Sequence, residues 1–150
     1  MDNRINIKNK KAYYNYEILE KHVAGMQLKG TEIKSIRQGK ASLGDSYAYF
    51  ENHELWIKNM RISEYDHSTF FNHDPYRDRK LLMNRKELNK LEKHTREKGL
   101  TIIVLRVFIN EKGLAKTEIG LARGKKLYDK RESIKQKDQK RDMERLGKMG

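Results

Sequence analysis

A chain of 150 residues is long enough to form one domain with a real hydrophobic core. It contains 34 Lys and Arg against 21 Asp and Glu, a formal net charge of +13, so a polyanion such as nucleic acid or an anionic membrane surface is the expected partner. The absence of cysteine excludes disulfides, cysteine-ligated zinc and thiol catalysis. No apolar run approaches the ~20 residues that span a bilayer, and the first residues lack the apolar stretch of a signal peptide, so we expect a cytoplasmic protein.

The first predicted strand begins within a group of tyrosines. Tyr14, Tyr16 and Ile18 recur with a period of two, which is typical of a β-strand with one buried face. We therefore interpret Tyr14 and Tyr16 as core residues. The preceding Lys10 and Lys11 are predicted to contact phosphates.

A short helix and a hairpin are predicted next. Residues 31–38 have the apolar spacing of a short helix, and Gly39 stands where a helix usually ends. Residues 46–50 and 55–60 are rich in aromatic and aliphatic side chains and flank a polar turn, which predicts a β-hairpin.

Histidines and aspartates gather in residues 66–78, where His67, His73, Asp74 and Asp78 suggest a metal or nuclease site. Metal ligands are normally held on ordered elements with supporting hydrogen bonds. This stretch contains the single proline and alternating charges, and so predicts an exposed loop instead. We expect no metal, no cofactor and no catalysis, because no nucleophile is placed beside a base either.

A second helix is predicted after residue 84. Asn84 is a good N-cap, and Glu87 three residues later completes a capping box. Met83 and Leu88 can pack on each other across the cap, and Gly99 ends the helix.

Residues 101–109 are rich in β-branched side chains and predict a strand that is buried on both faces. A turn ending in Gly113 leads to another strand over residues 114–122. Several short strands with helices inserted, in one basic domain, favour a mainly β fold: an OB-fold-like antiparallel β-barrel with two or three short helices, formed by residues 1–127.

Residues 120–126 look like a phosphate loop but lack the Walker spacing, so nucleotide hydrolysis is rejected. We interpret them as a glycine-relieved bend that brings Lys125 and Lys126 to a phosphate backbone, with a merely solvated loop as the alternative. Residues 128–150 form a basic tail without a continuous apolar face. We expect this tail to be disordered alone and helical when bound along RNA; a membrane-surface helix would need a broader apolar face.

Five sequence blocks together resemble the small protein B family, the protein partners of transfer-messenger RNA in bacterial ribosome rescue. The blocks are Asn-Lys-Lys-Ala at 9–12, Gly-Thr-Glu-Ile-Lys-Ser-Ile-Arg at 30–37, Asp-Ser-Tyr at 45–47, Asp-Pro-Tyr-Arg-Asp-Arg-Lys-Leu-Leu at 74–82, and Gly-Leu-Ala-Arg-Gly-Lys-Lys at 120–126 followed by Asp-Lys-Arg at 129–131. The resemblance implies an OB-type barrel and a non-catalytic adaptor. Such an adaptor binds the tRNA-like domain of transfer-messenger RNA and delivers it to stalled ribosomes.

The resemblance also implies partners and site residues. The partners are transfer-messenger RNA, the small-subunit decoding centre and mRNA channel of the ribosome, and elongation factor Tu with GTP acting on the same RNA; a monomer without membrane contact is expected. With Lys10, Lys11 and Gly124 added from the residue pattern, the predicted RNA-binding set is Lys10, Lys11, Leu82, Asn84, Lys116, Arg123, Gly124, Lys125 and Lys126. The predicted decoding-centre and tail set is Tyr128, Asp129, Lys130, Arg131 and Leu146.

Two positions and two other functions stay open. The residue pattern alone would place Leu82 in the core, and Val23 stands where the family often has an acidic residue, so a polar RNA contact there is in doubt. A generic OB-type binder of single strands and a His/Asp metallonuclease are the alternative functions.

Overall fold

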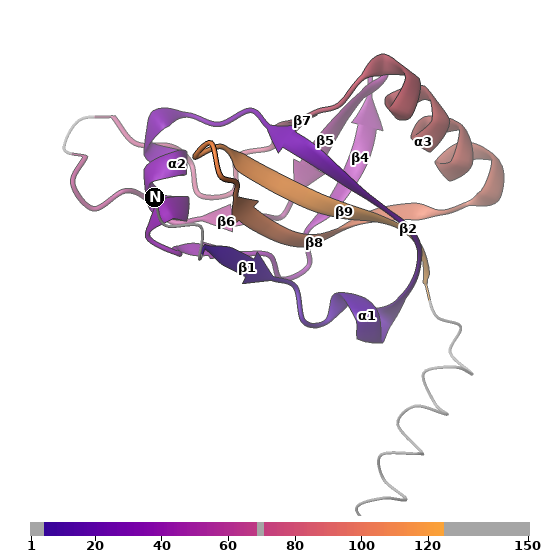
Figure 1. Ribbon diagram of the computed structural model, residues 1–150, viewed down its shortest axis with the longest axis horizontal. Helices are drawn as coiled ribbons and strands as arrows, with labels where there is room; N and C mark the ends of the chain where they lie inside the picture. Colours follow the sequence, from indigo (N-terminus) through magenta and orange to yellow (C-terminus); the bar gives the residue numbers. More distant parts are fainter. Residues whose placement is uncertain (1–4, 69–70, 125–150) are drawn as a thin grey trace, which may run out of the picture.

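The computed structural model describes residues 5–68 and 71–124. Within this part of the chain, strands dominate and three helices are inserted between them (Figure 1). In chain order the elements are β1 (Asn6–Lys8), α1 (Ala12–Asn15), β2 (Tyr16–Met26), α2 (Gly30–Arg37), β3 (Ala41–Ser42), β4 (Tyr47–Glu51), β5 (Glu54–Lys58), β6 (Arg61–Ile62), β7 (Arg79–Leu82), α3 (Arg85–Lys98), β8 (Thr101–Ile109) and β9 (Ala115–Gly124).

The strands form a closed antiparallel barrel. The sheet runs in the order β1-β8-β4-β5-β7-β2-β9, and β9 pairs in turn with β8, which closes the ring. One edge of β8 is shared by β4 near its start and β1 near its end, while the other edge pairs with β9 along its whole length. Closure removes unpaired strand edges, which would otherwise invite association. The predicted OB-fold-like barrel with short helices is confirmed.

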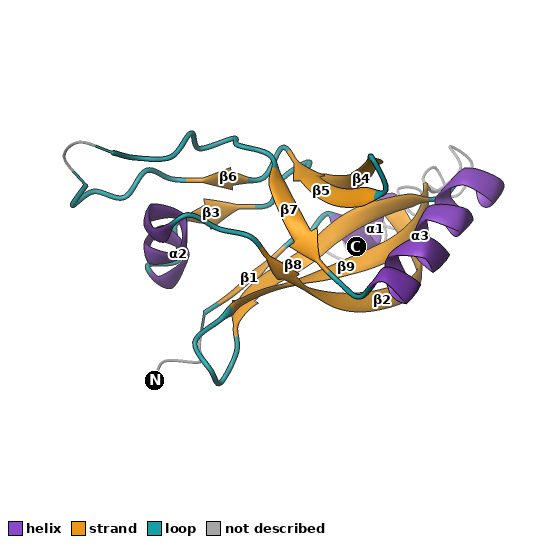
Figure 2. Ribbon diagram, turned by 90° about the horizontal axis from the view of Figure 1, so that it is seen from above, coloured by secondary structure: helices purple, strands orange, loops and turns teal. Residues whose placement is uncertain are grey.

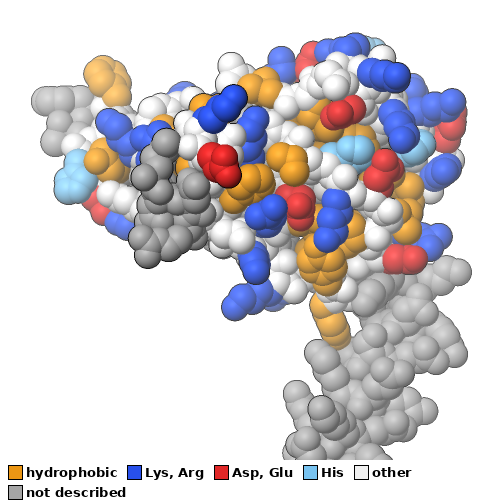
Figure 3. Space-filling view, in the orientation of Figure 1, with side chains coloured by type: hydrophobic (Ala, Val, Ile, Leu, Met, Phe, Trp, Pro, Cys, Tyr) orange, Lys and Arg blue, Asp and Glu red, His pale blue; other side chains and the backbone are white. Residues whose placement is uncertain are grey.

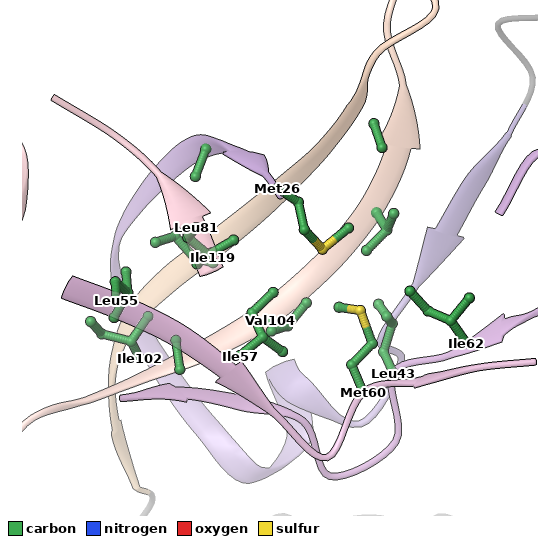
Figure 4. Close-up of a cluster of buried hydrophobic side chains, with 14 of the residues drawn as sticks. Met26, Leu43, Leu55, Ile57, Met60, Ile62, Leu81, Ile102, Val104 and Ile119 are labelled. Carbon is green, nitrogen blue, oxygen red and sulfur yellow. The ribbon is translucent and has the colours of Figure 1, made fainter. Parts of the chain in front are cut away.

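The barrel interior is filled by aliphatic side chains and methionines from most of the strands (Figure 4). On β5, Leu55 and Ile57 are fully buried while Trp56 between them is half-buried, as the period-two pattern requires. Each such side chain contributes roughly 1.5–3 kcal/mol when fully buried. The predicted hairpin is present: Asn52 and His53 form its two-residue turn with positive φ angles of 51° and 64°.

Strand β8 is buried on both faces, as predicted. Ile102 and Val104 belong to the barrel core, whereas Ile103 and Leu105 belong to a second, smaller cluster on the outside. Ala12 of α1 completes this outer cluster, and α1 lies against the outside of the barrel in Figure 1. The outer face of β8 is therefore covered by α1 and by the adjoining part of β2.

The predicted start of the first strand, at Tyr14, is wrong. The chain forms one helical turn over Ala12–Asn15, and the strand begins at Tyr16. The turn is needed because the chain must pass from β1, paired with β8, to β2, paired with β9, while placing Ala12 against the outer cluster. Tyr16 packs on that cluster as expected of a core residue, whereas Tyr14 sits in the helical turn.

Both predicted longer helices are confirmed, although the first spans Gly30–Arg37 instead of the predicted residues 31–38. The Asn84 side chain accepts a hydrogen bond from the backbone N–H of Glu87 at 2.8 Å, and Gly99 has the left-handed φ of 62° that a C-terminal glycine cap uses. Helix α2 ends at Arg37, and Gly39 has a φ of 73°. α2 and α3 lie toward opposite ends of the molecule (Figure 2).

The expectation of an exposed loop over residues 66–78 is wrong for His73, which is only 2% exposed. Its Nε2 lies 2.9 Å from the carbonyl oxygen of Ile62, and its Nδ1 lies 2.9 Å from the Thr31 hydroxyl. Because a carbonyl only accepts, Nε2 donates to Ile62, while Nδ1 and the Thr31 hydroxyl form the second hydrogen bond. His73 therefore anchors the loop to α2 and β6, and is not directed to the neighbouring aspartates.

A buried ion cluster joins the same elements. Glu32 of α2 and Arg79 of β7 are both fully buried, and Arg79 Nε donates to Glu32 Oε2 at 2.5 Å. Arg77 Nη2 donates to the other carboxylate oxygen at 2.5 Å. Burial by itself would raise the pKa of Glu32, but hydrogen bonds from Arg77, the Lys29 backbone and Arg79 outweigh burial and hold that pKa below its ordinary value. The cluster fixes α2 against the strand that carries Leu82.

Candidate nucleic-acid interface

The described members of the predicted RNA-binding set lie in two groups near opposite ends of β9. Lys116 is near its start, and Arg123 and Gly124 form its end. Gly124 lies eight positions after Lys116, which at about 3.3 Å per residue corresponds to roughly 26 Å. The barrel therefore has two candidate contact regions.

The first region is a pocket of about 390 Å³ between α2 and the start of β9, here called the α2 pocket. Its lining residues are Gly25, Met26, Leu28, Lys29, Gly30, Ile33, Arg37, Leu82, Gly113, Leu114, Ala115 and Lys116. Gly25 of β2 pairs with Leu82 of β7 on one side and with Lys116 of β9 on the other. Leu82 and Lys116 therefore lie on either side of the same residue of β2. The structure thus brings Leu82 and Lys116 together.

Leu82 is 50% exposed, whereas Leu81 is fully buried inside the barrel. The core position that the residue pattern alone suggested for Leu82 is therefore wrong, because alternation along β7 directs only one of these two leucines inward. Leu114, 53% exposed, adds a second apolar side chain to the same pocket. An apolar floor of this kind can pack against unstacked bases or ribose faces.

The rim of the α2 pocket is basic. Lys29 and Arg37 line it together with Lys116, and Arg37 also donates to the carbonyl oxygen of Gly113 at 3.4 Å. In Figure 1 the hairpin between β8 and β9 reaches α2, which is how these cations meet. Lys29 and Arg37 were not predicted as contacts. In the sequence, Lys29 directly precedes the block at 30–37 and Arg37 ends it. Both are far from Lys116 in the chain, so the sequence did not indicate that the three cations meet.

Asn84 lies two residues beyond the end of β7 and is exposed at the start of α3. Its carbonyl oxygen is used by the cap to Glu87, so its amide NH₂ group is the part chemically able to donate to RNA. The predicted double role, cap and RNA contact, is compatible with this geometry.

Helix α3 has a basic exposed face that the sequence reading did not include among the contacts. Figure 3 shows Lys and Arg side chains gathered over this helix. The exposed cationic residues of α3 are Arg85, Lys86, Lys90, Lys93, Arg96 and Lys98. Their number along 14 residues was visible in the sequence, but a charged helix face is usually only solvated.

The second region lies around α1 and the end of β9. Its pocket of about 330 Å³, here called the α1 pocket, is lined by Asn9, Lys11, Ala12, Asn15, Tyr16, Gly44, Asp45, Ser46, Ile103 and Gly124. Lys11 and Gly124 of the predicted set thus share one pocket, and Lys10 is exposed beside Lys11. Arg123 is exposed and its Nη2 donates to Glu17 at 2.7 Å. Exposed pairs of this kind are weak, about 0.2–1 kcal/mol, so Arg123 can exchange Glu17 for a phosphate.

Of the glycine-relieved bend expected at residues 120–126, only residues 120–124 lie in the described part of the chain, and these belong to β9. β9 continues as a strand to Gly124, which pairs with Tyr16, and a Cβ placed on Gly124 would meet no atom of the described residues within 4 Å. Gly120 is the glycine under constraint: a Cβ there would lie 3.1 Å from the Ile18 Cγ2 and 3.2 Å from the Leu105 Cδ1. This glycine lets β2 and β8 side chains pack over β9 in the outer cluster.

Several predicted residues lie outside the described part of the chain. These are Lys125, Lys126, Tyr128, Asp129, Lys130, Arg131 and Leu146, together with the boundary between residues 1–127 and 128–150. Within residues 5–68 and 71–124, no group of three or more His, Cys, Asp or Glu side chains is placed to hold a metal ion. In the same part of the chain, no helix has the length and apolarity to cross a membrane.

Comparison with known proteins agrees with this geometry. An SsrA-binding protein of Cytophaga hutchinsonii is 63% identical over 142 residues, covering 95% of this chain and 93% of that protein. One of Christiangramia forsetii is 58% identical over 148 residues, covering 99% and 94%. A solved structure described as "tmRNA-SmpB: a journey to the center of the bacterial ribosome" superposes with a TM-score of 0.69 at 46% identity, over 82% of this chain and 86% of that one. The family model described as SmpB protein matches residues 6–149, and the chain belongs to this SmpB protein family.

Proposed function

We propose that this chain is a non-catalytic RNA-binding adaptor for trans-translation, the rescue of stalled ribosomes by transfer-messenger RNA. Its barrel, residues 1–127, binds the tRNA-like domain of that RNA, and its tail, residues 128–150, enters the vacant mRNA channel. The names of the relatives support the RNA, and the solved structure named for tmRNA-SmpB and the bacterial ribosome supports the setting.

The observation that carries the proposal is the presence of predicted RNA contacts near both ends of β9. A closed barrel is a stiff spacer, so contacts about 26 Å apart can engage two different RNA surfaces at once. The α2 pocket combines an apolar floor with Lys29, Arg37 and Lys116, which suits a folded RNA with exposed bases. The α1 pocket lies where the chain continues into the tail.

The placement of these residues supports a division of labour between the two ends of the barrel. The α2 pocket, with Leu82, Asn84 and Lys116, holds the tRNA-like domain, so that the other end of the barrel points to the decoding centre. There Tyr128, Asp129, Lys130 and Arg131 stand in for the missing anticodon arm and codon, and Leu146 lies further along the channel. Lys10, Lys11, Arg123, Gly124, Lys125 and Lys126 contact RNA between the two.

The adaptor works as a monomer in the cytoplasm, where ribosomes translate. It carries out no reaction of its own and uses no cofactor. Elongation factor Tu with GTP acts on the acceptor end of the same RNA, away from the barrel.

The test of this division is removal of residues 129–150. The truncated chain should bind the tRNA-like domain with nearly the affinity of the full chain, because the barrel contacts are intact, and should fail to support ribosome rescue in a reconstituted translation system. A truncated chain that loses RNA affinity as completely as a chain altered in the α2 pocket would contradict the division.

A further inference from the structure

The α1 pocket contains a buried polar group that the fold itself does not use. Ser46 is only 3% exposed, and its Oγ has no hydrogen-bond partner in the described structure. Its backbone N–H donates to the Leu43 carbonyl at 2.7 Å, so the position of the residue is fixed. By contrast, the neighbouring Asn9 donates its amide to the Val104 carbonyl at 3.0 Å. A buried hydroxyl without a partner is rare in folded proteins, and the residue that carries this one lines the pocket.

The charges around the pocket narrow the chemistry of any ligand. Asp45 and Lys11 both line it, so it brings a carboxylate and an ammonium group beside Ser46. A phosphate group alone fits poorly, because Asp45 would repel it. The ligand must offer N–H donors to the carboxylate and acceptors to the ammonium group.

A guanine base has this combination. Its N1–H and N2–H₂ groups are two donors side by side, which one carboxylate can accept, and its O6 and N7 are acceptors for a lysine. Adenine and cytosine present a single amino group on the corresponding edge, and uracil presents one N–H between two acceptors. Tyr16 adds an aromatic ring to the pocket wall on which a base can stack.

The size and location of the pocket agree with such a ligand. A volume of about 330 Å³ lies in the ordinary range for small-ligand sites. Gly124 at the end of β9 lines the pocket without adding a side chain to it. Exposed Lys10, next to Lys11 in the chain, adds positive charge to this region.

We propose that the α1 pocket binds one unpaired guanosine, with Asp45 accepting from its N1 and N2 groups, Ser46 hydrogen-bonding the base or ribose, and Lys11 contacting an acceptor or the adjoining phosphate. The inference rests on the proposed function in that the guanosine would be part of RNA reaching the tail-bearing end of the barrel. A free guanine nucleotide has the same chemistry and is separated from RNA by the experiment below.

The experiment is an NMR titration of the ¹⁵N-labelled full chain with GMP, AMP, CMP, UMP and inorganic phosphate. GMP should shift the amide signals of Lys11, Ser46 and Gly124 and bind about tenfold more tightly than AMP, the effect of one bidentate base contact. Phosphate alone should leave the Ser46 signal in place. Equal shifts from all four nucleotides, or none from GMP, would overturn the proposal.

Variants identify the groups responsible. Asp45→Asn should remove most of the preference for GMP over AMP, and Ser46→Ala should weaken GMP binding several-fold. Asp66→Asn, an exposed carboxylate on another loop, is the matched control and should change neither. A GMP preference that survives Asp45→Asn would refute the role of the carboxylate, and because Asp45 is exposed this variant does not depend on the fold tolerating a core change.

A second pair of ligands tests whether the guanosine belongs to RNA or to a free nucleotide. A uridine oligonucleotide with one central guanosine should bind the α1 pocket more tightly than the same oligonucleotide of uridine only. Binding of GMP without this difference would support the pocket chemistry with a free nucleotide as ligand. The proposed function is judged separately, on the affinity of the unaltered chain for the tRNA-like domain, so the two can fail independently.

Discussion

Replacing Glu32 by Gln removes the carboxylate that accepts hydrogen bonds from two guanidinium groups, those of Arg77 and Arg79. Glu32 and Arg79 are both 0% exposed, and Arg77 is 27% exposed. Breaking a buried pair by removing one partner typically costs about 3–5 kcal/mol, because the remaining charge is left in a medium of low polarity. For a chain of this length about 1 kcal/mol corresponds to roughly 2–4 °C, so the expected fall in Tm is roughly 6–20 °C.

The measurement is thermal unfolding followed by circular dichroism at neutral pH. Glu17→Gln is the matched control, since Glu17 is 54% exposed and pairs with Arg123 at the surface. That change should cost less than about 1 kcal/mol. A loss from Glu32→Gln no larger than that of the control would refute the reasoning.

The pH dependence of Glu32→Gln gives a second readout. The pKa of Glu32 is lower in the folded chain than its ordinary value of about 4.3, so the unfolded state binds the proton more readily. The stabilisation by Glu32 is therefore complete above that ordinary value and is lost as the pH falls through the folded value. The difference in stability between the natural chain and Glu32→Gln should be largest near pH 7 and shrink below about pH 4. A difference that stays constant across this range would contradict the assignment.

Three further changes have definite expected results. Lys116→Ala should weaken binding to the tRNA-like domain and reduce the slope of log Kd against log salt concentration by about 0.7–0.9, the effect of one phosphate contact. Lys58→Ala, on the far strand β5, should change neither the affinity nor the slope. An unchanged slope in Lys116→Ala would count against a phosphate contact by Lys116. Gly120→Val should cost about 1–3 kcal/mol in urea unfolding through overpacking, while Gly124→Ala should be neutral; equal effects would contradict the packing described at Gly120. Asn84→Ala should cost about 1 kcal/mol through loss of the α3 cap, and stability within error of the natural chain would show that the cap contributes nothing.

Local features of the fold could be predicted from the sequence because neighbouring residues determine them. The cap at Asn84 depends on Glu87 three positions away, and the glycine at 99 ends α3 by its own backbone freedom. β8 was predicted at the right residues because its β-branched run serves two buried faces. The sequence carried these signals within a few residues.

The remaining features depend on residues that are far apart in the chain. The pair of Glu32 and Arg79 joins positions 47 residues apart, and each residue alone resembles an ordinary surface charge. The helical turn at α1 exists because β8 needs a cover for Leu105, which lies more than 90 residues later. No local pattern near Tyr14 contains that requirement.

The candidate site shows the same contrast between residues that a local pattern reveals and residues that depend on distant parts of the chain. Lys10 and Lys11 were recognised by charge, and Leu82 and Asn84 only through the family resemblance. Lys29 and Ser46 were missed because their partners in the pockets come from distant segments: β9 for Lys29, and α1 with the end of β9 for Ser46. Pairing across the barrel creates both pockets, and strand pairing is not readable from one sequence.

The most direct test of the adaptor is the affinity of the full chain for the tRNA-like domain of transfer-messenger RNA, measured beside an ordinary tRNA of equal length at the same salt concentration. Equal length and salt make the nonspecific phosphate attraction nearly the same for the two RNAs. The proposed function predicts a clear preference, of tenfold or more in Kd, for the tRNA-like domain. Equal affinity for the two RNAs would contradict it and leave only a basic barrel that binds RNA by charge.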